Sequence, residues 1–174
     1  MNYNTKLLHK NFIDLYKDNN KEKNPHSVPK LTKIVASVNF GNSGSDKKIV
    51  DSAMKDFLSI FGSKPVFFKS KVSDAAFKIR EGQIVGLKIT LRSDKMFLFL
   101  DKMIYVALPR IRDFRGIKKS FDVSGNLSIS LPGNSSLFLE SNLLQDLNLS
   151  FSISQSSPDL SLNLLSSINI PFLK

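Results

Sequence analysis

Cysteine and tryptophan are both absent from this chain of 174 residues. Without cysteine the chain can form no disulfide, offers no thiol nucleophile and cannot hold zinc through thiolates. No run of about 18 apolar residues exists, so we expect no membrane-spanning helix and no membrane partner. The N-terminus has neither the apolar segment of a signal peptide nor the arginines of a mitochondrial transit peptide. If the protein works in an organelle, the sequence favours synthesis there.

Catalytic motifs are missing as well. The two histidines, His9 and His26, are interpreted as surface or helix-face residues. The HExxH, GxSxG, P-loop and GxGxxG patterns do not occur, and the carboxylates are scattered beside lysines instead of paired. Residues 39–48 (NFGNSGSDKK) are Gly-rich and precede a predicted helix, but they lack the GK[ST] ending of a phosphate-binding loop, so a plain turn is favoured. We therefore expect no enzyme, metal or cofactor.

Positive charge is abundant but unevenly placed. The formal net charge is +10, and residues 1–122 carry 24 basic and 12 acidic side chains. Residues 123–174 carry Lys174 against Glu140, Asp146 and Asp159. A surplus confined to one part of the chain indicates a binding face for a polyanion. We therefore expect one domain over 1–174, with a basic part (1–122) that faces the polyanion and a neutral part of Ser/Leu-rich strands (123–174).

Apolar periodicity predicts an α+β fold with a largely antiparallel, twisted sheet and helices packed on one side. Leu and Phe at spacings of three and four predict helices, and alternation of Leu/Ile/Phe with Ser/Asn after Asp122 predicts half-exposed strands. The predicted helices are 4–17, 46–61, 94–107 and 158–166, and the predicted strands are 30–40, 65–69, 83–91, 126–131 and 147–154.

Several local features follow from the same patterns. Alternation would place Leu31 on the same strand face as Val35 and Ser37. Gly86 is a candidate β-bulge, and Pro109 is expected to end the helix that Ser93 caps. Pro132-Gly133 predicts a turn, and Ser45 or Asp46 is the expected cap of the second helix. Residues 69–78 show no clean period and are interpreted as a mobile basic loop.

Basic residues gather in three places, with aromatic residues between them. Lys47 and Lys48 open a predicted helix; Lys69, Lys71, Lys78 and Arg80 follow "PVFF"; and three arginines lie in "LPRIRDFRG", residues 108–116. Phosphates attract such clusters, and arginine adds bidentate contacts and stacking on bases. A basic α+β domain without a DNA-reading helix favours RNA. An alternative for 108–116 is an intramolecular brace in which Asp113 pairs with Arg110 or Arg115.

Two stretches, "KPVFFKSKVSDAAFKIREGQIVGLKITLR" and "ALPRIRDFRGIKKSFDVSGNLSIS", closely resemble the large-subunit ribosomal protein five (L-five) family of bacterial type. "VPKLTKIVASVNFG", "DKKIVDSA" and "NIPF" fit the same pattern in the same order, so the resemblance covers nearly the whole chain. It implies a structural protein of the ribosomal central protuberance that binds 5S rRNA through its sheet. It also implies contacts with large-subunit rRNA, P-site tRNA, small-subunit head protein number thirteen and neighbouring central-protuberance proteins.

The resemblance, together with the basic clusters, assigns two sets of contact residues. The tRNA-facing loop comprises Lys71, Ser73, Phe77, Lys78 and Arg80. The rRNA-facing set comprises Asn39, Lys47, Lys48, Lys69, Lys88, Thr90, Arg92, Arg110, Arg112 and Arg115.

Some positions depart from the family pattern. The family's first strand ends in Asn-x-Gly-x-Gly, whereas here Asn39 comes two residues late or Ser37 takes the asparagine's place. Ser63 replaces a Gln before "KP", and Asp74 and Ala76 occur in the tRNA-facing loop. The hypothesis is a diverged organellar member with altered or lost 5S contact. With 14 Phe, no Trp and more Lys than Arg, the composition favours a mitochondrial over a bacterial ribosome.

The sequence leaves two alternatives to an rRNA-binding protein. The neutral part after Asp122 could be a docking face in a protein-interaction module that has lost 5S rRNA binding. An RNA-modifying enzyme is disfavoured because no acid/base pair or cofactor motif is present.

Overall fold

The protein is built on one antiparallel sheet. In the computed structural model the described residues are 4–19, 27–41, 46–111, 114–131, 146–154 and 157–173. The strands are β1 (Lys30–Asn39), β2 (Val66–Lys69), β3 (Ile84–Leu91), β4 (Leu127–Leu131) and β5 (Leu147–Ser154). Their order is β2-β3-β1-β5-β4, and every neighbouring pair is antiparallel. The α+β prediction with a largely antiparallel sheet is confirmed.

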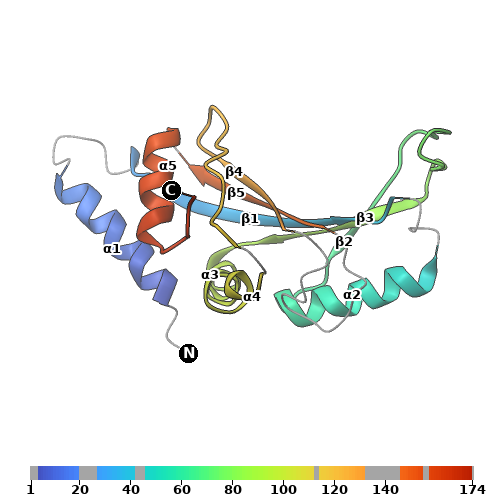
Figure 1. Ribbon diagram of the computed structural model, residues 1–174, viewed down its shortest axis with the longest axis horizontal. Coiled ribbons are helices and arrows are strands. Elements are labelled where there is room, and N and C mark those ends of the chain that lie inside the picture. The colour runs from blue at the N-terminus through green and yellow to red at the C-terminus, as the bar shows by residue number, and fades with distance from the viewer. Residues whose placement is uncertain are drawn as a thin grey trace.

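The helices cover one face and one end of this sheet. They are α1 (Asn4–Asn19), α2 (Lys47–Phe61), α3 (Ser93–Lys102), α4 (Leu108–Arg110) and α5 (Pro158–Ser167). Figure 1 shows α2, α3 and α4 beneath the sheet, and α1 and α5 at the end opposite β2. None of the helices in the described ranges is long and apolar enough to cross a membrane.

The core lies between the sheet and these helices. Ile34 of β1 and Phe151 of β5, which pair across the strands, are fully buried. Phe61 of α2 and Phe99 of α3 pack with ring centroids 4.9 Å apart, which joins the two helices. Burial of such large apolar side chains is the main stabilising contribution to a domain of this size.

The start of β1 differs from the alternation expected from the sequence. The β1–β5 register shifts between Leu31 and Lys33, so one residue of β1 bulges out. Leu31 therefore pairs with Ile153 and is 5% exposed, on the same buried face as Ile34. The expectation that Leu31 shares a face with Val35 and Ser37 is wrong, because a bulge reverses the phase of the strand.

The third predicted helix runs past the residue expected to end it. α3 continues through a π-helical turn, η3 (Met103–Ala107), into α4, which contains Pro109. The Leu108 N–H donates to the carbonyl of Met103, five residues back. A π turn changes which carbonyl faces the proline ring, so the usual clash with the preceding turn is avoided. The N-cap is Arg92, and Ser93 is the first helical residue.

The junction between α2 and β2 is held from α3. Gly62, the C-cap of α2, takes the left-handed conformation, with φ of 62°. The Lys95 ammonium donates to the Gly62 carbonyl (3.3 Å) and to the Ser63 hydroxyl (2.6 Å), while Lys102 donates to the Ile60 carbonyl (3.4 Å). Cations at a helix C-terminus satisfy its free carbonyls and oppose its dipole.

Other expectations have mixed outcomes. Asp46 occupies the expected N-cap position of α2, and Ser157 is the N-cap of α5. A bulge does occur beside Gly86, where the β2–β3 register shifts between Phe68 and Lys69. Four further expectations lie outside the described residues: His26, Ser45, the Pro132-Gly133 turn, and the pairing of Asp113 in the arginine-rich segment.

Candidate nucleic-acid interface

The sheet face turned away from α2 and α3 carries polar side chains on four strands. We call it the open face. Strand register places Ser37 of β1 between Lys88 of β3 and Asn148 of β5, and Val35 between Thr90 and Ser150. Its described members include Lys33, Val35, Ser37, Asn39, Lys88, Thr90, Ser128, Ser130, Asn148, Ser150 and Ser152. In the view of Figure 1 no described helix lies over the central part of this face.

Three residues predicted to contact rRNA meet on the open face. Asn39, Lys88 and Thr90 are all exposed and lie on the paired strands β1 and β3. Arg92 is exposed directly after β3. Ser37, two residues before Asn39, has the same orientation because side chains alternate along a strand. Both positions considered for the family's asparagine therefore face the same side.

The sequence did not predict which residues form the row of hydroxyl groups on the open face. Ser128 and Ser150 lie opposite each other, with their hydroxyl oxygens 3.3 Å apart. The alternation of Ser and Asn with Leu and Ile in β4 and β5 was read as half-exposed strands. The same signal could have identified a polar binding face, because half-exposed strands present every second side chain outward.

One end of the open face is shaped by close packing of an aromatic ring. Gly86 pairs with Phe68 of β2 on one side and with Asn39 on the other. A Cβ atom at Gly86 would overlap the Phe68 ring and the Val38 carbonyl oxygen. The ring therefore lies across the glycine, beside Asn39. Glycine is required here by this close approach, since a side chain would displace the ring or the backbone.

The connection between β2 and β3, residues 70–83, projects beyond the sheet at the end opposite α1 (Figure 1). Its backbone is braced internally. Asp74 and Ile79 exchange backbone hydrogen bonds of 2.9 and 3.0 Å, and the Asp74 carboxylate accepts from the Ala76 N–H at 2.9 Å. The Ser73 hydroxyl accepts from the Glu81 N–H at 2.9 Å. The two departures from the family pattern, Asp74 and Ala76, thus close the tip.

The projection presents its cations and one aromatic ring to solvent. Phe77 is 70% exposed and Val72 is 74% exposed. Lys71, Lys78 and Arg80 lie around them on the same connection, and all three are exposed. An exposed phenylalanine among cations is suited to stacking on a base near phosphates. Of the predicted tRNA-facing residues, Ser73 differs, because its hydroxyl is used to hold the projection together.

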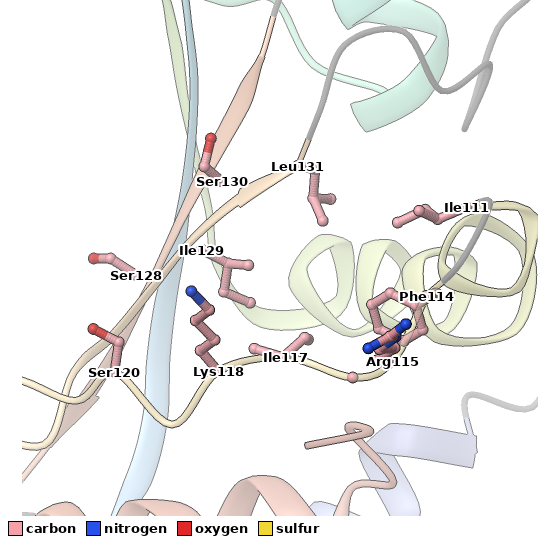
Figure 2. Close-up of a pocket in the computed structure, with 11 residues that line it drawn as sticks. Ile111, Phe114, Arg115, Ile117, Lys118, Ser120, Ser128, Ile129, Ser130 and Leu131 are labelled. Carbon is pink, nitrogen blue, oxygen red and sulfur yellow. The ribbon is translucent and has the colours of Figure 1, made fainter. Parts of the chain in front are cut away.

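The remaining predicted contacts do not join the open face. Lys47 and Lys48 are exposed in the first turn of α2, and Lys69 is exposed at the end of β2. Arg110 is exposed at the end of α4. Arg115 lines a groove on the helix side of β4, together with Ile129 and Leu131 (Figure 2). Arg112 lies outside the described residues.

The candidate cations have no acidic partner among the described residues. The salt bridges recorded there are Lys6–Asp94 (2.5 Å) and Lys17–Asp14 (3.9 Å), and both involve lysines of α1. No described acidic side chain pairs with the lysines and arginines of the projection or the open face. Such surface cations remain available to phosphates. Within the described ranges no group of His, Asp or Glu residues could hold a metal ion.

His9 has a structural role that the sequence did not reveal. It is 9% exposed, and its Nε2 accepts a hydrogen bond from the Leu31 N–H at 3.2 Å, across from α1 to the bulge in β1. Its ring lies 5.3 Å from that of Phe97. Burial, and secondarily the charge of Lys30, lower the pKa of His9. His9 is therefore a helix-face residue as expected, but a buried, neutral one.

Comparison with known proteins identifies related chains. Residues 24–80 match the family model described as Ribosomal protein L5, and residues 84–172 match the model for the C-terminus of the same ribosomal family. A Large ribosomal subunit protein uL5 from Francisella tularensis subsp. mediasiatica is 47% identical over 130 residues, covering 74% of this chain and 70% of that protein. The uL5 of Rippkaea orientalis is 49% identical over 110 residues, covering 63% and 61%.

The matched regions cover part of the length of the relatives. The chain spans about three-fifths of the length of the Rippkaea orientalis protein in the matched region. The relatives are bacterial proteins, so the organellar origin stays a prediction. The match to ribosomal proteins confirms the expectation that the chain is not an enzyme. With both family models matched in order over most of its length, the chain belongs to the ribosomal protein L5 family.

Proposed function

We propose that the protein is a structural component of the large ribosomal subunit that binds rRNA through its open face. The observation that carries this proposal is the polar surface formed by β3, β1, β5 and β4, which pairs Lys88 with Ser37 and Thr90 with Val35. A face built of hydroxyls, amides and few cations suits the shallow groove of A-form RNA, where ribose hydroxyls and phosphates are displayed. Membership of the L5 family supports this assignment.

The roles of the open-face residues differ by chemistry. Lys88 and Arg92 would neutralise phosphates, which supplies affinity that falls as salt rises. Asn39, Ser37 and Thr90 would donate and accept hydrogen bonds with ribose hydroxyls or phosphate oxygens. The 5S rRNA, where the ribosome contains one, is the RNA that the family resemblance assigns to this face, with large-subunit rRNA as the further partner.

The projection is assigned to tRNA. Phe77, with Lys71, Lys78 and Arg80, would contact the P-site tRNA, and Ser73 would keep the projection in shape. A braced projection loses little conformational entropy on binding, which favours contact with a partner that comes and goes. Placement in the central protuberance, near small-subunit head protein number thirteen and neighbouring central-protuberance proteins, completes the proposal. A ribosome of mitochondrial origin remains part of it.

The cations outside the open face are proposed as additional rRNA contacts. Lys47, Lys48 and Lys69 are exposed on α2 and β2, and Arg110 is exposed at the end of α4. Arg112 is proposed on the family motif alone. These residues would act on phosphates from other directions than the open face, so the protein would lie between RNA segments.

The test is the salt dependence of RNA binding by the full chain. Labelled 5S rRNA and a large-subunit rRNA fragment would be titrated with protein at several KCl concentrations. We expect Lys88→Ala to weaken binding and to reduce the slope of log K against log salt by about 1. Thr90→Val should weaken binding with the slope unchanged, because it removes a neutral hydrogen-bonding group.

A matched control lies on α1, which carries none of the proposed RNA contacts. Lys10 is exposed in α1, so Lys10→Ala removes the same charge away from the open face and should leave binding nearly unchanged. Equal effects of the two lysine variants would contradict the open face as the RNA site. If neither RNA binds, while Lys88→Ala still reduces co-sedimentation with the large subunit, the alternative of a protein-interaction module is favoured.

A further inference from the structure

A groove on the helix side of β4 is not used by the proposed RNA contacts of the open face. Its volume is about 530 Å³, and it lies between β4 and the segment that follows α4. Figure 2 shows Ile129 and Leu131 of β4 and Ile111 and Ile117 of the facing segment directed toward this space, while the hydroxyls of Ser128 and Ser130 point away from it. The groove therefore has an apolar floor beside a strand.

The strand beside the groove has an edge that no described strand covers. β4 pairs with β5 on one side, and none of the strands in the described ranges lies on its other side. The chain approaching β4 touches that outer edge only at its start, where Phe121 pairs with Leu127 and the Asp122 N–H donates to the Asn126 carbonyl at 3.0 Å. Since the Asn126 carbonyl points outward, alternation directs the backbone N–H and C=O of Ser128 and Ser130 outward too.

The charge at the groove has one sign. Arg115 and Lys118 line it and are exposed, and no acidic side chain is among the described residues that line it. The other polar residues that line it are Ser120, Ser128 and Ser130, and the hydroxyls of Ser128 and Ser130 point away from the groove. An occupant with negative charge is thus complementary to the rim, and an occupant with apolar groups is complementary to the floor.

We propose that this groove binds an extended segment of a partner protein, in which apolar side chains alternate with acidic ones, as a sixth strand on β4. The backbone of such a segment would pair with Ser128 and Ser130. Its apolar side chains, two residues apart, would lie against Ile129 and Leu131, which have the same spacing. Its carboxylates would lie near Arg115 and Lys118. This mode of binding combines main-chain hydrogen bonds with side-chain pockets.

An RNA strand is a less suitable occupant. It offers no regular row of backbone donors and acceptors to match a strand edge. Bases stack on aromatic or guanidinium planes, whereas the apolar side chains that line the groove are branched aliphatic ones apart from Phe114. The proposal also gives the family motif at 108–116 a second role, since Ile111 and Arg115 belong to it.

The probe is a fluorescein-labelled peptide, EVEVEVE, with the scrambled peptide EEVVVEE and backbone-N-methylated EVEVEVE as controls. The full chain would be titrated against each, with binding followed by fluorescence anisotropy. We expect EVEVEVE to bind at least tenfold more tightly than either control, because only it combines alternation with free backbone donors. Equal binding of EVEVEVE and EEVVVEE would reduce the interaction to charge attraction and overturn the proposal.

Two substitutions of Ser130 distinguish the contribution of its backbone N–H to peptide binding from that of its side chain. Ser130→Pro removes an outward N–H from an edge strand, where proline is tolerated, and should weaken EVEVEVE at least tenfold. Ser130→Ala, whose hydroxyl points away from the groove, should leave the affinity within about twofold. Lys118→Ala should weaken binding and flatten its salt dependence. An unchanged affinity of Ser130→Pro would contradict strand addition.

Amide hydrogen exchange of the wild-type chain tests strand addition on β4 even where a variant fails to fold. The amides of Ser128 and Ser130 should exchange quickly in the free protein and slow at least tenfold with saturating EVEVEVE. Unchanged exchange on adding the peptide, or amides already protected in the free protein, would overturn the proposal. So would a single-stranded oligoribonucleotide that protects these two amides better than the peptide does.

Discussion

Gly116 lies against the backbone that joins Phe172 to Leu173. A Cβ atom at Gly116 would come within 2.7 Å of the Leu173 nitrogen and 2.8 Å of the Phe172 carbonyl carbon. The neighbouring Ile117 donates to the Pro171 carbonyl (2.8 Å) and accepts from the Leu173 N–H (2.9 Å). The glycine of "DFRG" and the C-terminal "NIPF" therefore belong to one structural unit, although they lie far apart in the sequence.

Replacing this glycine should destabilise the fold. Gly116 has φ of +113°, a conformation that residues with a Cβ rarely adopt, and the new methyl group would meet backbone atoms that cannot move aside easily. We expect Gly116→Ala to lower the free energy of unfolding by about 2–4 kcal/mol. Chemical denaturation of the isolated protein would measure this loss.

Gly82 offers a matched control for backbone strain alone. Its φ is +77°, but a Cβ there would meet nothing within 4 Å. Gly82→Ala should therefore cost only about 1 kcal/mol, the penalty of the left-handed conformation. If both variants lose the same stability, the contact with the C-terminal segment contributes nothing at Gly116.

Stability should fall in mild acid because of His9. Its pKa in the folded state is lowered from 6.5, so the unfolded chain binds a proton more readily than the folded chain does. Folding is then favoured above pH 6.5, and this contribution is lost progressively as the pH falls below 6.5 toward the lowered pKa of the folded state. Unfolding free energies measured between about pH 7.5 and about pH 5 should show this decline.

The variant His9→Gln isolates the effect. A glutamine can still accept from the Leu31 N–H, but it does not titrate. The difference in stability between wild type and His9→Gln should depend on pH, with the wild type losing more as the pH falls. Parallel curves would show that His9 does not couple folding to protons.

The elements that alternate or repeat cleanly are the ones that the sequence predicted. The Ser/Asn alternation of β4 and β5 and the apolar stripe of α2 each express one period along a continuous segment. The hydrogen-bonded brace of the projection did not show as a period, because its bonds join side chains to nearby backbone groups. Asp74 and Ser73 accept such bonds, and neither signals them by residue type alone.

The features that escaped prediction depend on contacts between distant segments. The bulge that buries Leu31 is fixed by the β5 register and by the hydrogen bond from Leu31 to His9. The π turn before Pro109 is a local rearrangement that periodicity does not encode. For the candidate site, the sequence identified Asn39, Lys88 and Thr90, but strand order was needed to show that they share one face.

Substitution of Phe77 should affect tRNA binding, whereas substitution of Phe99 should affect the stability of the fold. Phe77 is 70% exposed at the tip of the projection, whereas Phe99 is 1% exposed in the core. Phe77→Ala should leave stability within about 0.5 kcal/mol and weaken tRNA binding by about 1–3 kcal/mol if the ring stacks on a base. Phe99→Ala should cost about 3–5 kcal/mol of stability. Thermal denaturation and tRNA titration of both variants would test this.

Tyrosine at the same position provides a further control. Phe77→Tyr keeps an aromatic ring and should retain most of the tRNA affinity that Phe77→Ala loses. Equal losses in the two variants would argue against stacking. A large loss of stability in Phe77→Ala would contradict the exposed position of the ring.

Asn39 and Ser37 should both contribute to rRNA binding, because they project from the same face of β1. Asn39→Ala and Ser37→Ala each remove one polar group from this face. Each substitution should therefore weaken rRNA binding by about 0.5–1.5 kcal/mol. Ser59→Ala, which removes an exposed hydroxyl of α2 bonded to the Asp56 carbonyl, is the matched control and should have no effect. Filter binding with 5S rRNA and with a large-subunit rRNA fragment would measure all three. A loss of affinity with Asn39→Ala alone would place the family's asparagine at 39, and a loss with Ser37→Ala alone would place it at 37. If neither substitution lowers the affinity, β1 does not contact these RNAs.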